Sequence, residues 1–136
     1  MSKKVTLKSN KAKKPSSAAP KSVSLGRLYV TATFNNTIVS LTDPAGNVLA
    51  WSSSGNAGFK GARRATPFAA ISAVEKVAQK GKSLGMSQIE VYIKGPGPGR
   101  DASVRALKNS GLNIIMIADV TPMPHNGPRA EKRRRV

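Results

Sequence analysis

The chain has 136 residues, with 23 Lys or Arg against 6 Asp or Glu, and its formal net charge is +17. This length fits one domain with one core. The absence of Cys excludes disulfides and zinc sites with Cys ligands, and no apolar run reaches the length of a membrane span. So large a positive excess repels itself and indicates a polyanionic partner.

The positive charge is concentrated at the two ends of the chain. Residues 1–22 hold seven Lys and no acid, and residues 125–136 hold five basic residues against Glu131. We therefore expect a disordered basic arm over 1–22, an α/β RNA-binding domain over 23–120 and a basic tail over 121–136. The first residues lack the apolar region of a signal peptide, and an organellar transit peptide is kept as an alternative.

The first half of the domain has apolar patterns that are typical of strands, with clear alternation of apolar and polar residues over 28–34. These patterns predict strands over 28–34, 37–42 and 48–52, the last two joined by a type I turn sequence at 43–46. The following stretch to residue 65 is too polar and glycine-rich for a regular element. Thr66 and Pro67 then predict a sharp helix start, and the helix should end at Gly81 or Gly85.

The second half predicts a strand over 89–93, a turn over 94–100 (KGPGPGR) and a helix capped by Asp101. The apolar run 113–120 predicts a strand covered on both faces. The expected fold is a single α/β domain of order β-β-β-α-β-α-β, with a mixed five-stranded sheet and two helices.

The turn over 94–100 has the features of an anion site. A strand, a glycine-rich turn and a helix N-terminus present backbone N–H groups and the positive end of a dipole. Lys94 and Arg100 bracket this turn, so we expect Lys94, Arg100 and the glycine N–H groups to meet phosphate.

A cofactor is the first alternative for that phosphate. Gly97, Gly99 and Ala102 satisfy a loose dinucleotide pattern, and Asp119 lies where a ribose-binding acid would be expected. However, Pro96 and Pro98 remove two N–H donors, and no second half-site follows. We expect no cofactor.

A nuclease is the second enzymatic alternative, and the acids do not support it. Asp43, Glu90, Asp101 and Asp119 share no convincing spacing for two-metal chemistry, and His125 is the only His. We therefore expect neither a metal site nor an enzyme.

The stretch 58–64 (GFKGARR) favours nucleic acid, because Lys60, Arg63 and Arg64 are suited to phosphates and Phe59 to a base. Phe59 filling the core is an equal alternative. Four other aromatic side chains are assigned mainly to packing: Tyr29, Trp51, Phe68 and Tyr92. Arg105 and Lys108, just beyond the turn, are placed either against RNA or on a solvated helix face.

Structured RNA explains the charge better than duplex DNA does. Two basic arms on a small basic core suit threading between RNA helices, and no helix-turn-helix, zinc finger or basic zipper pattern is present. A histone-like DNA-compacting protein is the alternative.

Several motifs in this order resemble a known family. They are residues 33–37 (TFNNT), 58–61 (GFKG), 65–70 (ATPFAA), 95–101 (GPGPGRD) and 121–127 (TPMPHNG). They closely resemble the universal small-subunit ribosomal protein eleven, in its bacterial form, from about residue 24 to the C-terminus. The resemblance implies a ribonuclease-H-like sheet without catalysis, in a cytoplasmic ribosome.

The family's surroundings supply the expected partners. The resemblance implies a place on the platform of the small subunit, where the protein bridges helices of the small-subunit rRNA and helps form the messenger Shine–Dalgarno cleft. The implied neighbours are small-subunit proteins seven, eighteen and often twenty-one, with initiation factor three as a further candidate.

The resemblance also carries RNA-contacting stretches onto this chain. They are Lys60, Arg63 and Arg64; Gly95, Gly97, Gly99 and Arg100; and, in the tail, His125, Asn126, Arg129, Lys132, Arg133, Arg134 and Arg135. The chain departs from the family in residues 1–22 and at Ala130-Glu131, where two prolines are usual. Asn126-Gly127 is also a sequence prone to deamidation.

Overall fold

The computed structural model describes residues 22–136, so the expected arm over 1–22 lies outside the described residues except for Ser22. The elements are β1 (Leu25–Ala32), β2 (Thr37–Thr42), β3 (Val48–Ser53), the 3-10 helix η1 (Gly61–Ala65), α1 (Pro67–Ser83), β4 (Gln88–Lys94), α2 (Gly99–Asn109) and β5 (Asn113–Asp119). The predicted order is confirmed. The short η1 is an addition, since the sequence predicts no regular element there.

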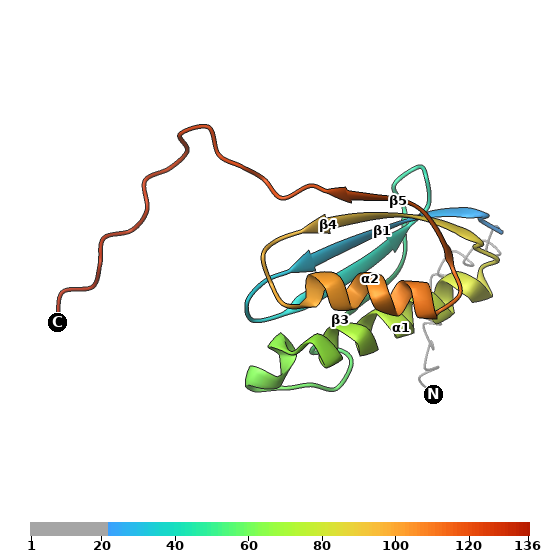
Figure 1. The fold of residues 1–136 in the computed structure, drawn as a ribbon, viewed down its shortest axis with the longest axis horizontal. Helices are drawn as coiled ribbons and strands as arrows, with labels where there is room; N and C mark the ends of the chain where they lie inside the picture. Colours follow the sequence, from blue (N-terminus) through green and yellow to red (C-terminus); the bar gives the residue numbers. More distant parts are fainter. Residues whose placement is uncertain (1–21) are drawn as a thin grey trace, which may run out of the picture.

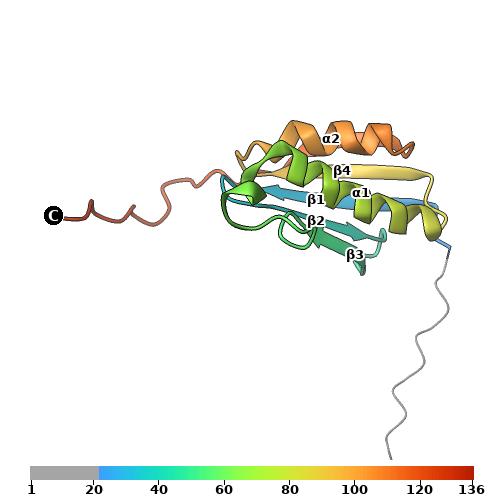
Figure 2. The same ribbon diagram turned by 90° about the horizontal axis from the view of Figure 1, so that it is seen from below.

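The five strands form one mixed sheet in the order β3-β2-β1-β4-β5. The first three strands pair antiparallel, and β4 pairs parallel with both β1 and β5. Both helices lie on the same face of this sheet, α1 over β2 and β3 and α2 over β1, β4 and β5 (Figures 1 and 2). The chain is therefore a two-layer α/β domain with one open sheet face.

The core lies between the sheet and the helices. Alternate strand residues such as Leu28, Val39 and Val91 are fully buried and meet Val74 and Val77 of α1. This alternation is the period that the sequence shows, because successive side chains of a strand point to opposite faces.

The two helices begin differently. The Thr66 hydroxyl accepts a hydrogen bond from the Ala69 N–H at 3.4 Å, and Pro67 is the first helical residue, as predicted. In contrast, α2 begins at Gly99 after Pro98 and has no side-chain cap. Asp101 is therefore not the cap. It lies in the first turn, where a negative charge suits the helix dipole.

The prediction that the last strand is covered on both faces is wrong. β5 is an edge strand, and the side chains of Ile115 and Ile117 are each 53% exposed. The reason is topological, since both helices cover one face and no strand follows β5. The packing assignment also fails for Trp51 and Phe68, which are 60% and 66% exposed.

The open sheet face carries the remaining aromatic pair. Tyr29 and Tyr92 face each other on β1 and β4, with ring centroids 5.2 Å apart in a stacked arrangement. Arg27 donates to Glu90 at 3.0 Å beside them. These two tyrosines pack on each other rather than in the core.

Candidate nucleic-acid interface

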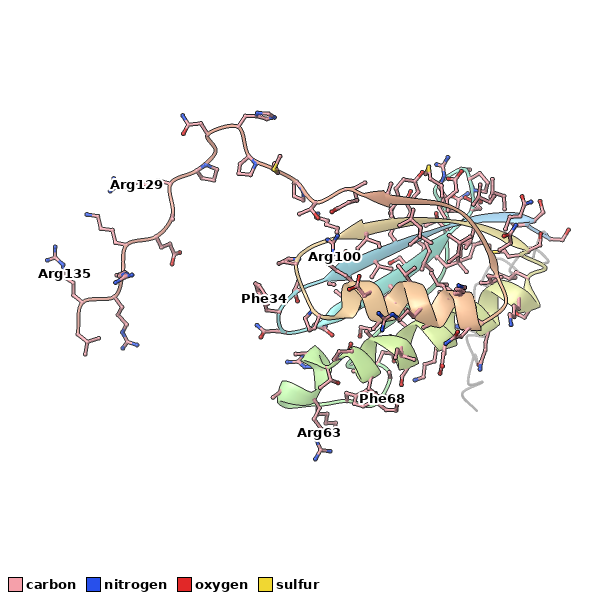
Figure 3. All side chains as sticks on the ribbon, viewed as in Figure 1. Phe34, Arg63, Phe68, Arg100, Arg129 and Arg135 are labelled. Carbon is pink, nitrogen blue, oxygen red and sulfur yellow. The ribbon has the colours of Figure 1, made fainter. Side chains whose placement is uncertain are left out.

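Three loops meet at one end of the domain, which we call the loop end: residues 33–36, 58–65 and 94–100. The Gly97 N–H donates to the Ala32 carbonyl at 2.9 Å, which joins the turn to the end of β1. Gly99 packs against Thr37 and Ala70, so α2 begins beside the first turns of β2 and α1. Figure 3 shows Phe34, Arg63 and Arg100 at this end of the molecule.

The turn over 94–100 has its glycines for a packing reason. A Cβ at Gly95 or Gly97 would overlap the carbonyl oxygen of Ala32 or Thr33, and one at Gly99 would overlap the Thr37 hydroxyl. Gly95 also has a φ of +96°, which favours glycine. The turn is therefore pressed directly onto the neighbouring backbone.

The N–H groups of this turn do not all face outward. The Gly95 N–H donates to the Thr121 hydroxyl at 3.2 Å, and the Gly97 N–H donates to Ala32. Both donors already have internal acceptors, so a phosphate at these two N–H groups would have to share or displace those acceptors. Contact between the surface of the turn and RNA stays a prediction.

Arg100 is engaged within the protein. Its Nη1 donates to the Gly95 carbonyl at 2.6 Å and its Nη2 to the Asp119 carboxylate at 2.9 Å. The Thr121 hydroxyl donates to Asp119 at 2.6 Å. The bonds from Thr121, then the Arg100 guanidinium, hold the pKa of Asp119 well below its usual range. Arg100, Asp119 and Thr121 thus form a node that joins the turn to the start of the tail.

The cations of residues 58–65 are differently placed. Lys60, Arg63 and Arg64 are exposed, and none belongs to the two ion pairs found among residues 22–136. Among the described residues, the side chains of this group make one hydrogen bond, from Arg64 Nε to the Gly61 carbonyl at 3.3 Å. These guanidinium and ammonium groups are available to an anion.

The position of Phe59 agrees fully with neither of its two interpretations, which are stacking on a base and filling the core. Its side chain is half-buried, and its ring meets that of Phe68 edge-on at 5.7 Å. Phe34 is a further exposed aromatic, 71% accessible at the tip between β1 and β2. The predicted strand over 28–34 places Phe34 as its last apolar residue, but β1 ends at Ala32 and Phe34 lies in the loop beyond it.

The tail leaves the domain beside the turn. The Val120 N–H donates to the Ile93 carbonyl at 2.8 Å, and residues 121–136 are all exposed. The tail then runs away from the sheet (Figure 1). It carries the predicted basic residues together with His125 and Asn126, whose φ is 67°.

Arg105 and Lys108, the two predicted cations of α2, follow the loop end along the helix. Arg105 lines a hollow with Ile93, Val104 and Ile117. Lys108 is exposed and lies about 12 Å along the helix axis from Arg100. The structure therefore does not gather Lys108 with the other predicted contacts.

Two further observations concern residues 22–136 alone. No helix in this part of the chain combines the length and the apolar character needed to cross a membrane. Within the same residues, no group of three or more His, Cys, Asp or Glu side chains is arranged to hold a metal ion.

A comparison with known protein families identifies the family of this chain. The family model of Ribosomal protein S11 matches residues 26–135, which is most of the chain. The chain belongs to this family. It is therefore a structural ribosomal protein without enzymatic activity, and membership implies binding to small-subunit rRNA and to other ribosomal proteins. The dinucleotide and nuclease alternatives are set aside.

Proposed function

We propose that this protein binds and bridges helices of the small-subunit rRNA on the platform, and that it helps form the cleft that holds the messenger Shine–Dalgarno duplex. The observation that carries this proposal is the gathering of free cations and the basic tail at one end of a compact domain. Phosphates from separate RNA helices would meet the exposed η1 residues and the tail.

The proposed roles at the loop end differ from residue to residue. Lys60, Arg63 and Arg64 pair with phosphates, while Lys94 and the outer surface of the turn lie against the RNA backbone. Arg100 acts mainly as a positioning residue, because its donors hold Gly95 and Asp119. For Arg105 and Lys108 the open alternatives are still a direct contact and a solvated face.

The proposed partners follow the family resemblance. We infer contacts with small-subunit proteins seven and eighteen, with twenty-one where it is present, and with initiation factor three at the messenger cleft. The proposed location is a cytoplasmic ribosome of bacterial type.

Sedimentation tests the proposal. Most of the protein should travel with small subunits through a density gradient and stay with them after a moderate salt wash. Footprinting of the rRNA in subunits with and without the protein should then show protection in at least two helices of the platform. Protection of a single helix would contradict bridging, and a protein pool free of subunits would contradict the ribosomal role.

A further inference from the structure

A second basic site lies on the flank of the domain, in a groove between β3 and α1 that we call the flank groove. It has a volume of about 370 Å³. Its lining residues come from β3, the loop after it and α1: Trp51, Ser52, Asn56, Lys76, Gln79, Lys80 and Ser83. No carboxylate is among them, so the groove has the charge of two ammonium groups.

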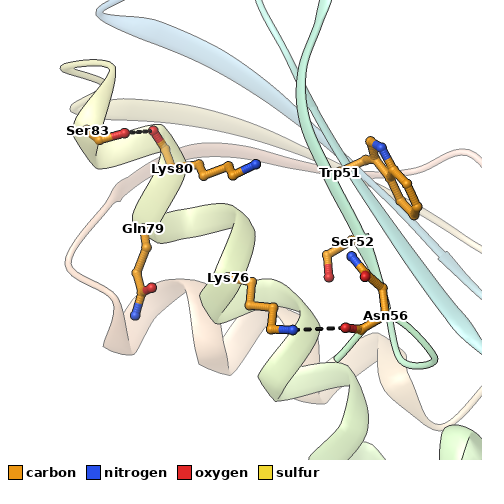
Figure 4. A pocket seen from close by; sticks show the side chains of 7 residues that line it. All are labelled: Trp51, Ser52, Asn56, Lys76, Gln79, Lys80 and Ser83. Carbon is orange, nitrogen blue, oxygen red and sulfur yellow. Dashed lines mark hydrogen bonds between the residues drawn. The ribbon is translucent and has the colours of Figure 1, made fainter. Parts of the chain in front are cut away.

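The α1 side of the groove follows from helical spacing. Lys76, Lys80 and Ser83 recur at intervals of four and three residues, which places them on one face of the helix. Lys76 Nζ donates to the Asn56 backbone carbonyl at 2.9 Å and so fixes the loop against the helix (Figure 4). Neither lysine is in an ion pair among the described residues. Within residues 22–136, both ammonium groups thus lack an anionic partner.

The floor of the groove holds a second, independent sign of a ligand. The Ser52 side chain is only 1% exposed, and its hydroxyl has no hydrogen-bond partner within residues 22–136. Buried hydroxyl groups normally have a partner, so an unpaired one in the wall of a groove is a donor that a bound group can satisfy. Ser54 is also unpaired but does not line the groove. Ser52 is therefore a candidate donor to an anion held by the lysines.

Trp51 stands at the rim of the same groove. It is the only Trp of the chain, and its side chain is 60% exposed on an edge strand. Figure 4 shows its indole pointing away from α1, on the outer side of β3. The indole and the two lysines therefore lie on opposite sides of the edge strand β3, and a nucleotide that passes over this edge can place its base on the indole and its phosphate in the groove.

We propose that the flank groove binds a phosphate of an unpaired RNA segment, with the adjoining base stacked on Trp51 across the β3 edge. This inference rests on the proposed RNA-binding function and adds a second contact surface to it. Lys76 lies about 14 Å along α1 from Pro67, where the loop end begins. One RNA-binding domain would then hold RNA at its end and on its flank.

Trp51 makes the proposal directly measurable on the full chain. Because no other Trp is present, selective excitation of Trp reports this site alone. A short oligouridylate should quench the fluorescence, whereas an RNA duplex with as many phosphates should bind without comparable quenching. In parallel, anisotropy of a labelled RNA reports total binding, whichever surface is used.

Matched variants distinguish RNA binding in the groove from a general effect of positive charge. Lys80→Gln and Lys82→Gln each remove one positive charge from the same helix, but Lys82 does not line the groove. Lys80→Gln should weaken oligouridylate binding and lower its salt-dependence slope by about one. Lys82→Gln should change neither appreciably. Trp51→Ala should weaken binding about tenfold.

The outcomes distinguish this inference from the function on which it rests. RNA binding without quenching, or equal effects of the two lysine variants, would overturn the flank groove and leave the loop end intact. Quenching by inorganic phosphate alone, or by polyglutamate, would reassign the groove to a free anion or to an acidic protein. No RNA binding by anisotropy would overturn both proposals.

Discussion

The two glycine-rich segments of the loop end differ in how strongly the rest of the domain holds them. The turn over 94–100 is fixed by close backbone packing at Gly97 and by the hydrogen bonds of Arg100. The segment over 58–65 is exposed, and no residue of η1 is buried. Both contain glycines and cations, yet the first is a rigid part of the fold and the second a set of free charges.

The residues that make the loop end rigid are therefore not the residues expected to supply most of its affinity for RNA. A phosphate gains most from cations without an internal partner, since a guanidinium already bonded to a carboxylate must give up that bond or share it. The turn therefore supplies a fixed shape and fixes the exit of the tail, while residues 58–65 and the tail supply charge. The predictions below test this division.

The largest effect is expected from Gly97→Ala. The new Cβ would overlap the Thr33 carbonyl, so the turn or the end of β1 must move, at a cost of about 3 kcal/mol in the free energy of unfolding. Urea unfolding measures it. Gly55→Ala is the control, because the nearest atom to the added Cβ would be the Arg64 Cδ, at an ordinary contact distance of 3.6 Å. Equal stabilities for the two variants would show that the turn is not held by its packing.

Reversing two free charges should come next. Arg63→Glu with Arg64→Glu should lower the salt-dependence slope of RNA binding by about two and weaken binding tenfold or more, about 1.4 kcal/mol. Stability should not change, because both side chains are exposed. Lys82→Glu, compared with Arg64→Glu alone, makes the same single change of charge at a residue that lies away from the loop end and outside the predicted contacts. If that control weakens binding as much, the effect is only that of net charge.

Arg100→Gln should show the opposite pattern. It removes the bonds to Gly95 and Asp119, so the urea midpoint should fall, while the salt slope should change less than in Arg64→Gln. Comparing these two neutralising variants in both assays separates the contribution of Arg100 to stability from its contribution to RNA binding. A full unit of slope lost with unchanged stability would make Arg100 a direct phosphate contact.

The Asp119 carboxylate should report on the same node through its pKa. The depressed pKa means that ionised Asp119 stabilises the fold above the ordinary carboxyl pKa of about 3.9, and that this contribution is lost as the pH falls toward the folded-state value. NMR titration should find a larger upward shift of this pKa in Thr121→Val than in Arg100→Gln, since Thr121 contributes most. Asp43, whose pKa is lowered by Asn47, should be unaffected by either variant.

The sequence was sufficient for features that depend on neighbours along the chain. The apolar residues between two turn sequences predict β2 over its full length, and Thr66-Pro67 predicts the start of α1. Features that depend on distant neighbours were not accessible in this way. The apolar run of β5 does not say that the strand lies at an edge, and the pattern around Gly97 does not say that its N–H already has an acceptor.

The candidate sites differ in the same way, because some join sequence neighbours and others join residues that are distant in the chain. Lys60, Arg63 and Arg64 are adjacent in sequence, and their basic character is visible there. The flank groove depends on Trp51 and Lys80, which meet only because β3 packs beside α1. The role of Arg100 likewise depends on Asp119 and Thr121, which the crossover from β4 through α2 to β5 returns to the turn.

The smallest effect is expected at Asn126-Gly127, the only Asn-Gly pair in the chain. Both residues are exposed, so the Gly127 nitrogen can attack the Asn126 side-chain carbonyl, release ammonia and form a succinimide that water opens to aspartate or iso-aspartate. Each event adds one negative charge to the basic tail and should lower RNA affinity slightly. Peptide mapping of aged protein should find iso-aspartate here, and Gly127→Ala should suppress it. Its absence from aged wild-type protein would mean that the local backbone, with Asn126 at a φ of 67°, prevents the attack.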